Sequence, residues 1–261
     1  MSKISILGCG WLGLPLGDEL TKKGYDVNGS TTTSHKLKKI ERLGIKPYFI
    51  DLSPEFSGDP SFFSCETLVI NIPPRNRDSD DHFHEKQLLS IRSEVKSKKV
   101  SHVLFVSSTA VYPNTNSKVT EEDASAESLS RGGVPLLKME NLFKEDDSFE
   151  TTVLRFGGLY GPDRNPAYFL AGKKNLGGGT NPVNMIHRDD CIGIIEQIIK
   201  EQIWGEVFNA CSPNKPSRKE FYLEAAKSLG VEPPEFSDEP QDYKDVSSQK
   251  LIDRLGYRFL Y

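Results

Sequence analysis

The sequence lacks paired cysteines. Only four cysteines occur among 261 residues, and they are scattered along the chain. They form no CxxC pair and no zinc-type pattern with histidine, so we expect buried free thiols, no disulfide and no metal site. This usage is typical of a reducing compartment and predicts a cytoplasmic protein. The cysteines are Cys9, Cys65, Cys191 and Cys211.

The sequence also lacks a strong charge excess and a long apolar run. Its 33 lysines and arginines against 37 aspartates and glutamates give a formal net charge of -4. This balance offers no basic footprint for nucleic acid or an anionic membrane surface. No apolar run approaches the roughly 20 residues that span a bilayer. No basic segment with a cleavage site precedes the first strand, so we expect no signal peptide.

Short apolar runs alternate with helical patterns through the first 155 or so residues. Leu12, Leu16 and Leu20 follow the first run at a spacing that places them on one face of a helix, and Pro15 fixes the start of that helix near Gly10. Repeated strand–helix alternation predicts a doubly wound parallel sheet of the Rossmann type. The predicted strands are residues 3–8, 25–30, 46–53, 66–74, 101–108 and 151–161, and the predicted later helices are residues 34–44, 81–100 and 135–146.

Glycine, proline and asparagine become more frequent after residue 157. Helices at 189–202 and 217–230 and a strand at 206–211 follow, which predicts a small C-terminal α/β lobe for the substrate. We therefore expect a dinucleotide-binding domain over residues 1–157 and the lobe over 158–261, with interleaving of the two left open. Asp190 is expected to cap the first of these helices, and His187 to make an anchoring hydrogen bond.

Three glycines, Gly8, Gly10 and Gly13, follow the first strand in the spacing GxGxxG, with Trp11 and Leu12 between them. In a strand–loop–helix context the first glycine permits a tight turn, the second lets the backbone approach a diphosphate, and the third lets helix and strand pack closely. The anion then meets the amide groups at the start of the helix. The loop therefore predicts a dinucleotide site, and a purely structural turn is the alternative.

The choice of dinucleotide depends on the end of the second strand, where an NAD site usually carries a carboxylate. This chain has Ser30, Thr31 and Thr32 there, with lysines soon after. Hydroxyl donors and positive charge favour the 2′-phosphate of NADP over NAD, although the hydroxyls could also cap the next helix. Asp51 is placed to meet the adenine amino group, or to serve as a turn residue. Asn71 and Pro73, after the fourth strand, are expected to line the cofactor trough.

Five stretches resemble the extended short-chain dehydrogenase/reductases, the NAD-dependent epimerase/dehydratase group. They are "GCGWLG", "VSSTAVYP", "RFGGLYGP", "NMIHRDD" and "SSQKLIDRLGYRF", and they occur in the order found in that group. The resemblance implies a Rossmann domain, a smaller substrate lobe and an active site between them. GxGxxG in place of the more common GxxGxxG is similar to an atypical branch of small members.

Catalysis in that group uses a Ser or Thr that holds the substrate oxygen, and a YxxxK pair. The lysine binds the nicotinamide ribose and lowers the pKa of the tyrosine so that it can transfer a proton near neutral pH. The resemblance places Ser108 and Lys138 at the Ser/Thr and Lys positions. Val134 stands where the tyrosine belongs. The usual mechanism therefore cannot be carried over intact.

Three interpretations remain open. Tyr112 could be the proton donor; the substrate or a water molecule could manage the proton; or the chain could bind the cofactor without turning it over, as a redox sensor or scaffold does. The leading hypothesis is an NAD(P)-dependent oxidoreductase or epimerase acting on a small polar or sugar-like substrate. The helix expected at 81–100 could also pair with a second copy of the chain.

Overall fold

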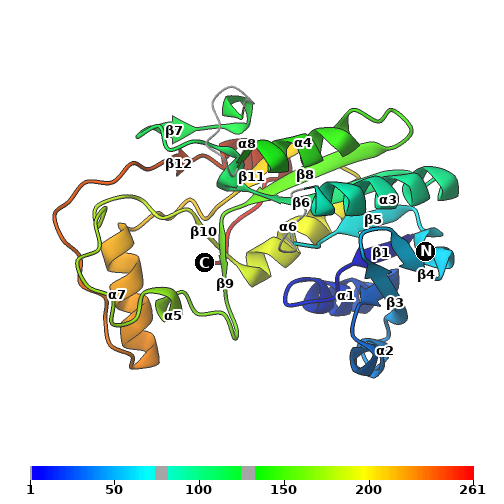
Figure 1. The fold of residues 1–261 in the computed structure, drawn as a ribbon, viewed down its shortest axis with the longest axis horizontal. Coiled ribbons are helices and arrows are strands. Elements are labelled where there is room, and N and C mark those ends of the chain that lie inside the picture. The colour runs from blue at the N-terminus through cyan, green and yellow to red at the C-terminus, as the bar shows by residue number, and fades with distance from the viewer. Residues whose placement is uncertain (1, 74–81, 125–132) are drawn as a thin grey trace. The chain divides into compact units, whose positions relative to one another are not determined.

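The structure is a computed structural model that describes residues 2–73, 82–124 and 133–261 (Figure 1). Its main sheet has eight strands in the order β11-β8-β6-β5-β1-β2-β3-β4. The strands are β1 (Lys3–Leu7), β2 (Asp26–Thr31), β3 (Lys46–Leu52), β4 (Phe56–Gly58), β5 (Thr67–Ile70), β6 (His102–Ser108), β8 (Glu150–Phe156) and β11 (Val207–Ala210). The pairs β1–β2, β1–β5, β2–β3 and β5–β6 are parallel. The predicted doubly wound α/β class is therefore confirmed.

Two short strand pairs lie outside the main sheet: β9 (Gly158–Tyr160) with β10 (Met185–His187), and β7 (Lys118–Val119) with β12 (Asp245–Val246). The helices are α1 (Gly13–Lys22), α2 (Leu37–Glu41), α3 (Phe83–Lys98), α4 (Gly133–Lys144), α5 (Ala167–Leu170), α6 (Arg188–Glu201), α7 (Arg218–Leu229) and α8 (Gln249–Leu255). In the part of the chain that the structure describes, no helix is both long and apolar enough to cross a bilayer.

The chain forms two compact units, each assembled from separate segments. The first unit comprises residues 1–107, 135–154 and 195–207, and the second comprises residues 108–134, 155–194 and 208–261. The chain therefore passes between the units several times. The predicted division at residues 157 and 158 stays a prediction, as does pairing of α3 with a second copy.

The first unit buries its core on the two faces of the parallel strands. Side chains of α3 and α4, such as Leu88 and Phe143, pack with Leu7 of β1 in one cluster. Ile6, the residue before Leu7 in β1, points to the opposite face of the sheet, toward α1. A β-carbon built on Gly17 of α1 would lie 3.3 Å from the Ile6 side chain. Figure 1 shows α3 and α4 on one side of these strands and α1 on the other. The near-continuous apolar runs of the sequence follow from this double coverage.

Three local features differ from expectation. Helix α1 begins at Gly13 and not near Gly10, because residues 9–12 form turns in which the Gly10 amide donates to the Gly8 carbonyl. The strand β4 was not predicted; it pairs antiparallel with β3 at the sheet edge. Asp190 does not cap α6, which already begins at Arg188; its carboxylate instead accepts hydrogen bonds from the Tyr257 hydroxyl and the Leu260 amide.

Candidate functional site

The loop between β1 and α1 is shaped by close backbone approaches at its first and third glycines. A β-carbon on Gly13 would lie 2.2 Å from the Gly8 carbonyl oxygen, and one on Gly8 would lie 2.5 Å from the Asn71 carbonyl oxygen. Gly8 also has a φ of 105°, in the region that favours glycine. The Asn71 side-chain amide donates to the Gly8 carbonyl at 3.1 Å. The predicted roles of these two glycines in tight turning and close packing match this geometry.

Gly10 differs from its two neighbours in the motif. A β-carbon there would meet nothing within 4 Å, and its φ lies outside the positive range. The fold therefore does not require a glycine at this position, whereas a ligand that approaches the backbone closely would. The amides of Leu12 and Gly13 lie at the start of α1, where they have no acceptor within the helix. The Leu12 side chain is buried in the core, so only its backbone can contact a ligand. Trp11 is half-buried.

The hydroxyl groups at the end of β2 and just after it are partly engaged in hydrogen bonds within the chain. Ser30 is 3% exposed, and its hydroxyl accepts a hydrogen bond from the Gly8 amide at 2.9 Å. Thr31 is also buried, and its hydroxyl accepts from the Thr33 amide at 3.1 Å. Thr32 is exposed. Of the three predicted residues, Thr32 is therefore the most accessible to a 2′-phosphate, while Ser30 ties the glycine loop to β2.

Three of the predicted cofactor residues line one small cavity of about 70 Å³ in the first unit. Thr32 and Pro73 follow β2 and β5, and Asp51 lies near the end of β3. The cavity is therefore at the carboxyl ends of parallel strands, where open α/β sheets bind ligands. The Asp51 carboxylate accepts hydrogen bonds from the Leu52 amide and the Ser53 hydroxyl, both at 3.0 Å.

Two side chains of α3 that were not predicted also line this cavity. They are Phe83 and Gln87, and the Gln87 amide donates to the Leu52 carbonyl at 2.7 Å. A signal for Gln87 existed in the sequence. It is a polar residue at a buried position of a helix face that otherwise carries Phe83, Leu88 and Ile91.

Ser108 ends β6 in the second unit. It is half-buried, and its hydroxyl accepts from the Ala110 amide at 3.2 Å, which caps a short 3-10 turn. Its hydroxyl proton is not used by that bond. The neighbouring Ser107, assigned to the first unit, points the other way: it donates to the fully buried Glu140 carboxylate of α4 at 2.5 Å.

Tyr112 is buried within the second unit, with an exposed fraction of 2%. Its hydroxyl donates to Asn209 Oδ1 and accepts from Arg155 Nη1, each at 2.7 Å. Burial outweighs the neighbouring guanidinium and raises the pKa of Tyr112 to about 12. A phenol so buried and so raised is poorly suited to proton transfer at neutral pH. The arrangement favours a structural role over the predicted role of donor.

Lys138 lies on α4 of the first unit, one turn after Val134. Its side chain is 60% exposed, and its ammonium contacts Glu85 Oε1 of α3 at 2.6 Å. This ammonium and then the ring of His82 hold the pKa of Glu85 below its usual value. Ser108 and Lys138 belong to different units.

The four cysteines are free, and Cys65 alone is not fully buried. Burial raises the pKa of the Cys9 thiol to about 12, so this residue of the glycine loop is a poor nucleophile. The Nδ1 atom of His187 accepts a hydrogen bond from the Asp189 amide at 3.2 Å, which matches the expected anchoring role.

Solved structures with this fold cover the whole chain. A functionally unknown conserved protein from Silicibacter pomeroyi DSS is 20% identical, with a TM-score of 0.81 over 94% of its length. The UDP-N-acetylglucosamine 4-epimerase from Bacillus cereus is 15% identical, with a TM-score of 0.80 over 95% of its length. MoeE5 in complex with UDP-glucose and NAD is 19% identical, with a TM-score of 0.79 over 94% of its length.

The chain therefore has the fold of solved epimerases, which is the fold that the sequence motifs predicted. No protein-family model matches the chain. Protein YeeZ of Escherichia coli, in strains K12 and O157:H7, is 30% identical across all of this chain and 97% of its own length. The chain belongs to the YeeZ family.

Proposed function

We propose that this protein binds a nicotinamide dinucleotide and acts as an NAD(P)-dependent oxidoreductase or epimerase on a small polar or sugar-like substrate. The observation that carries the proposal is the open space at Gly10, between two glycines that the fold itself requires. Solved structures of the same fold include one with bound NAD and UDP-glucose. The four free thiols suit a reducing, cytoplasmic setting.

The described residues fit such a cofactor. The backbone of Gly10, Trp11, Leu12 and Gly13 would meet the diphosphate at the start of α1. Asp51 and the other residues of the small cavity would meet the adenosine half. A bound nicotinamide supplies or accepts a hydride, and this chain's own residues would then have to bind, orient and protonate the substrate.

NADP is the proposed cofactor, and NAD is the alternative. Thr32 is exposed at the cavity, and no carboxylate follows β2 directly to repel a 2′-phosphate. Lys36, a few residues further on, is exposed and adds positive charge. A titration with NADPH and NADH, followed by fluorescence, tests this choice. We expect tighter binding of NADPH, and a smaller preference in Thr32→Val; a clear preference for NADH would contradict the assignment.

In the proposed enzyme, the Ser108 hydroxyl donates to and orients the reacting oxygen, and Lys138 holds the nicotinamide ribose. Lys138 would have to exchange its contact with Glu85 for the ribose hydroxyls. Loss of Glu85 should therefore free the ammonium: we expect Glu85→Gln to keep or strengthen cofactor binding and Lys138→Met to weaken it. Equal cofactor affinity in Lys138→Met and the wild type would remove Lys138 from the site.

The second candidate is a protein that binds the cofactor without turnover, as a sensor or scaffold. The buried, fully bonded hydroxyl of Tyr112 and the valine at position 134 favour this alternative. A screen of sugars and nucleotide sugars, followed by nicotinamide absorbance in single-turnover conditions, separates the two. Hydride transfer to or from any substrate supports the enzyme. Tight cofactor binding with no transfer across the screen supports the sensor.

A further inference from the structure

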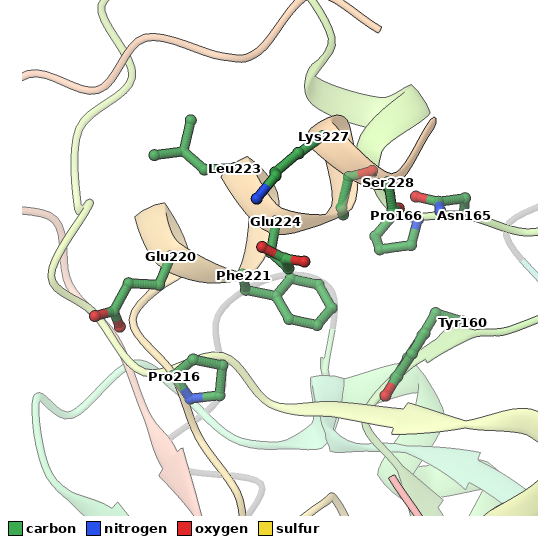
Figure 2. Close-up of a pocket in the computed structure, with 11 residues that line it drawn as sticks. Tyr160, Asn165, Pro166, Pro216, Glu220, Phe221, Leu223, Glu224, Lys227 and Ser228 are labelled. Atoms are coloured by element: carbon green, nitrogen blue, oxygen red, sulfur yellow. Dashed lines mark hydrogen bonds between the residues drawn. The ribbon is translucent and has the colours of Figure 1, made fainter. Parts of the chain in front are cut away.

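The second unit contains a cavity of about 690 Å³ that none of the predicted site residues lines. It lies between α7 and the segment of residues 160–166 before α5, and Figure 2 shows its lining side chains. Its volume falls within the roughly 300–1,000 Å³ that is usual for small-molecule sites. Several of the lining side chains are apolar, among them Tyr160, Pro166, Pro216 and Phe221.

The walls of this cavity are held in place by the chain itself. Ser217 and Glu220 form a capping box at the start of α7, and Gly230 ends the helix in a left-handed conformation. The Tyr160 ring packs edge-on against Phe221, with ring centres 5.7 Å apart, and against His187 at 5.1 Å. A ligand would therefore meet a largely pre-formed wall, which lowers the entropic cost of binding.

The charges around the cavity select the kind of ligand. The cavity is lined by two carboxylates, Glu220 and Glu224, and by one ammonium, Lys227. Both the Ser217 amide and hydroxyl already donate to Glu220, at 2.9 and 2.7 Å. Glu224 is exposed and lies one turn after Phe221 on α7, and Figure 2 shows both among the lining side chains. Among the described residues that line the cavity there is no arginine. This lining disfavours phosphates and carboxylates and favours a cation.

We propose that this cavity binds a small organic cation, an amine that carries an apolar ring. The ammonium group pairs with Glu224 and lies near the faces of aromatic rings, where a cation is attracted to the π-system. The apolar ring occupies the space bordered by Tyr160, Phe221 and Pro166. This site lies wholly within the second unit, so the inference goes beyond the proposed cofactor function and does not depend on it.

The test uses the full chain and matched probes that differ in charge. Phenethylamine and 3-phenylpropionate share a phenyl ring and a short linker but carry opposite charges, and UDP-glucose represents an anionic nucleotide sugar. Binding of each is measured by calorimetry, with and without saturating NADPH. We expect phenethylamine to bind and the two anions to bind at least about tenfold more weakly. The titrations with NADPH report separately on the proposed cofactor function.

Two variants place the amine in this cavity. Glu224→Gln keeps the shape of an exposed side chain and removes its charge, and we expect about fivefold weaker binding of phenethylamine. Phe221→Leu removes the aromatic face with a similar expected loss. Glu145→Gln, an exposed glutamate of the first unit, is the matched control and should change nothing. Absence of amine binding, equal binding of 3-phenylpropionate, or amine binding that Glu224→Gln leaves unchanged would each overturn the proposal.

Discussion

Replacement of Gly10 by alanine separates cofactor binding from folding. The added β-carbon would meet no atom of the protein within 4 Å. Since the backbone at this position does not have a positive φ, alanine fits without strain. Alanine also restricts the unfolded chain, so the free energy of unfolding should stay equal or rise by up to about 1 kcal/mol. The same methyl group would occupy the space through which a diphosphate reaches the loop amides.

The expected loss of affinity follows from those amide contacts. Loss of one hydrogen bond to a charged group costs about 1.5–3 kcal/mol, which corresponds to roughly 10- to 150-fold weaker binding. Gly13→Ala gives the opposite pattern. Its β-carbon would lie 2.2 Å from the Gly8 carbonyl oxygen, so the backbone must shift. The free energy of unfolding should therefore fall by about 1–3 kcal/mol.

The assay pairs two measurements on each variant. Chemical denaturation gives the free energy of unfolding, and quenching or enhancement of NADPH fluorescence gives the affinity. If a diphosphate approaches the loop at Gly10, the Gly10→Ala variant folds like the wild type and binds NADPH weakly. Wild-type affinity in Gly10→Ala would show that no diphosphate approaches this loop, and a strongly destabilised Gly10→Ala would show that the open space is not there.

Three further changes test other parts of the structure. Tyr112→Phe removes one hydrogen-bond partner from Asn209 and one from Arg155. We expect denaturant titrations to show a free energy of unfolding lower by about 1–3 kcal/mol, with any turnover retained. Loss of turnover at unchanged stability would instead identify Tyr112 as the proton donor. Burial raises the pKa of Asp146, but its hydrogen bonds from Ser148, Lys96 and Arg92 outweigh this and hold the pKa well below the usual range. The ionised carboxylate therefore stabilises the fold above about pH 4 and loses this effect as the pH falls further. In Asp146→Asn, the free energy of unfolding should decrease less between about pH 4 and lower pH than in the wild type. An equal decrease in both proteins would contradict this. Asp190→Asn should speed amide hydrogen exchange over residues 257–261, because Leu260 and Tyr261 donate to that carboxylate; unchanged exchange there would contradict its anchoring role.

The parallel strands were predictable because their side chains are buried on both faces. Ile4, Ile6 and Leu7 are all at most 1% exposed and Ser5 between them is buried too, so side chains on both faces of β1 are covered. The short edge strand β4 has the sequence Phe-Ser-Gly, and two of its three residues are exposed, so nothing in its composition distinguishes it from a loop. Burial, and not propensity, decided which strands the sequence revealed.

The glycine loop was predictable for a different reason. Spacing alone located Gly8, Gly10 and Gly13, because a strand–helix turn fixes their geometry locally. The partners of polar side chains depend on contacts distant in sequence. Ser30 binds an amide 22 residues away, and Tyr112 binds Asn209 across 97 residues. No local pattern carries that information, so the sequence named both hydroxyls as candidates and left their partners open.

Neither Tyr112, the candidate for the missing tyrosine, nor Lys138, the lysine of the motif, has surroundings that promote proton transfer. A lysine promotes such chemistry when its charge lowers the pKa of a nearby phenol. Here the Lys138 ammonium instead contacts Glu85 and lowers the pKa of a carboxyl group. The Tyr112 phenol has its pKa raised to about 12 by burial. Of the residues that the motifs nominated, Ser108 keeps a hydroxyl able to hold a substrate oxygen, so a reaction would have to draw its proton from the substrate or from water. A pH–rate profile without a phenol or lysine titration near neutrality is the signature expected of such a site.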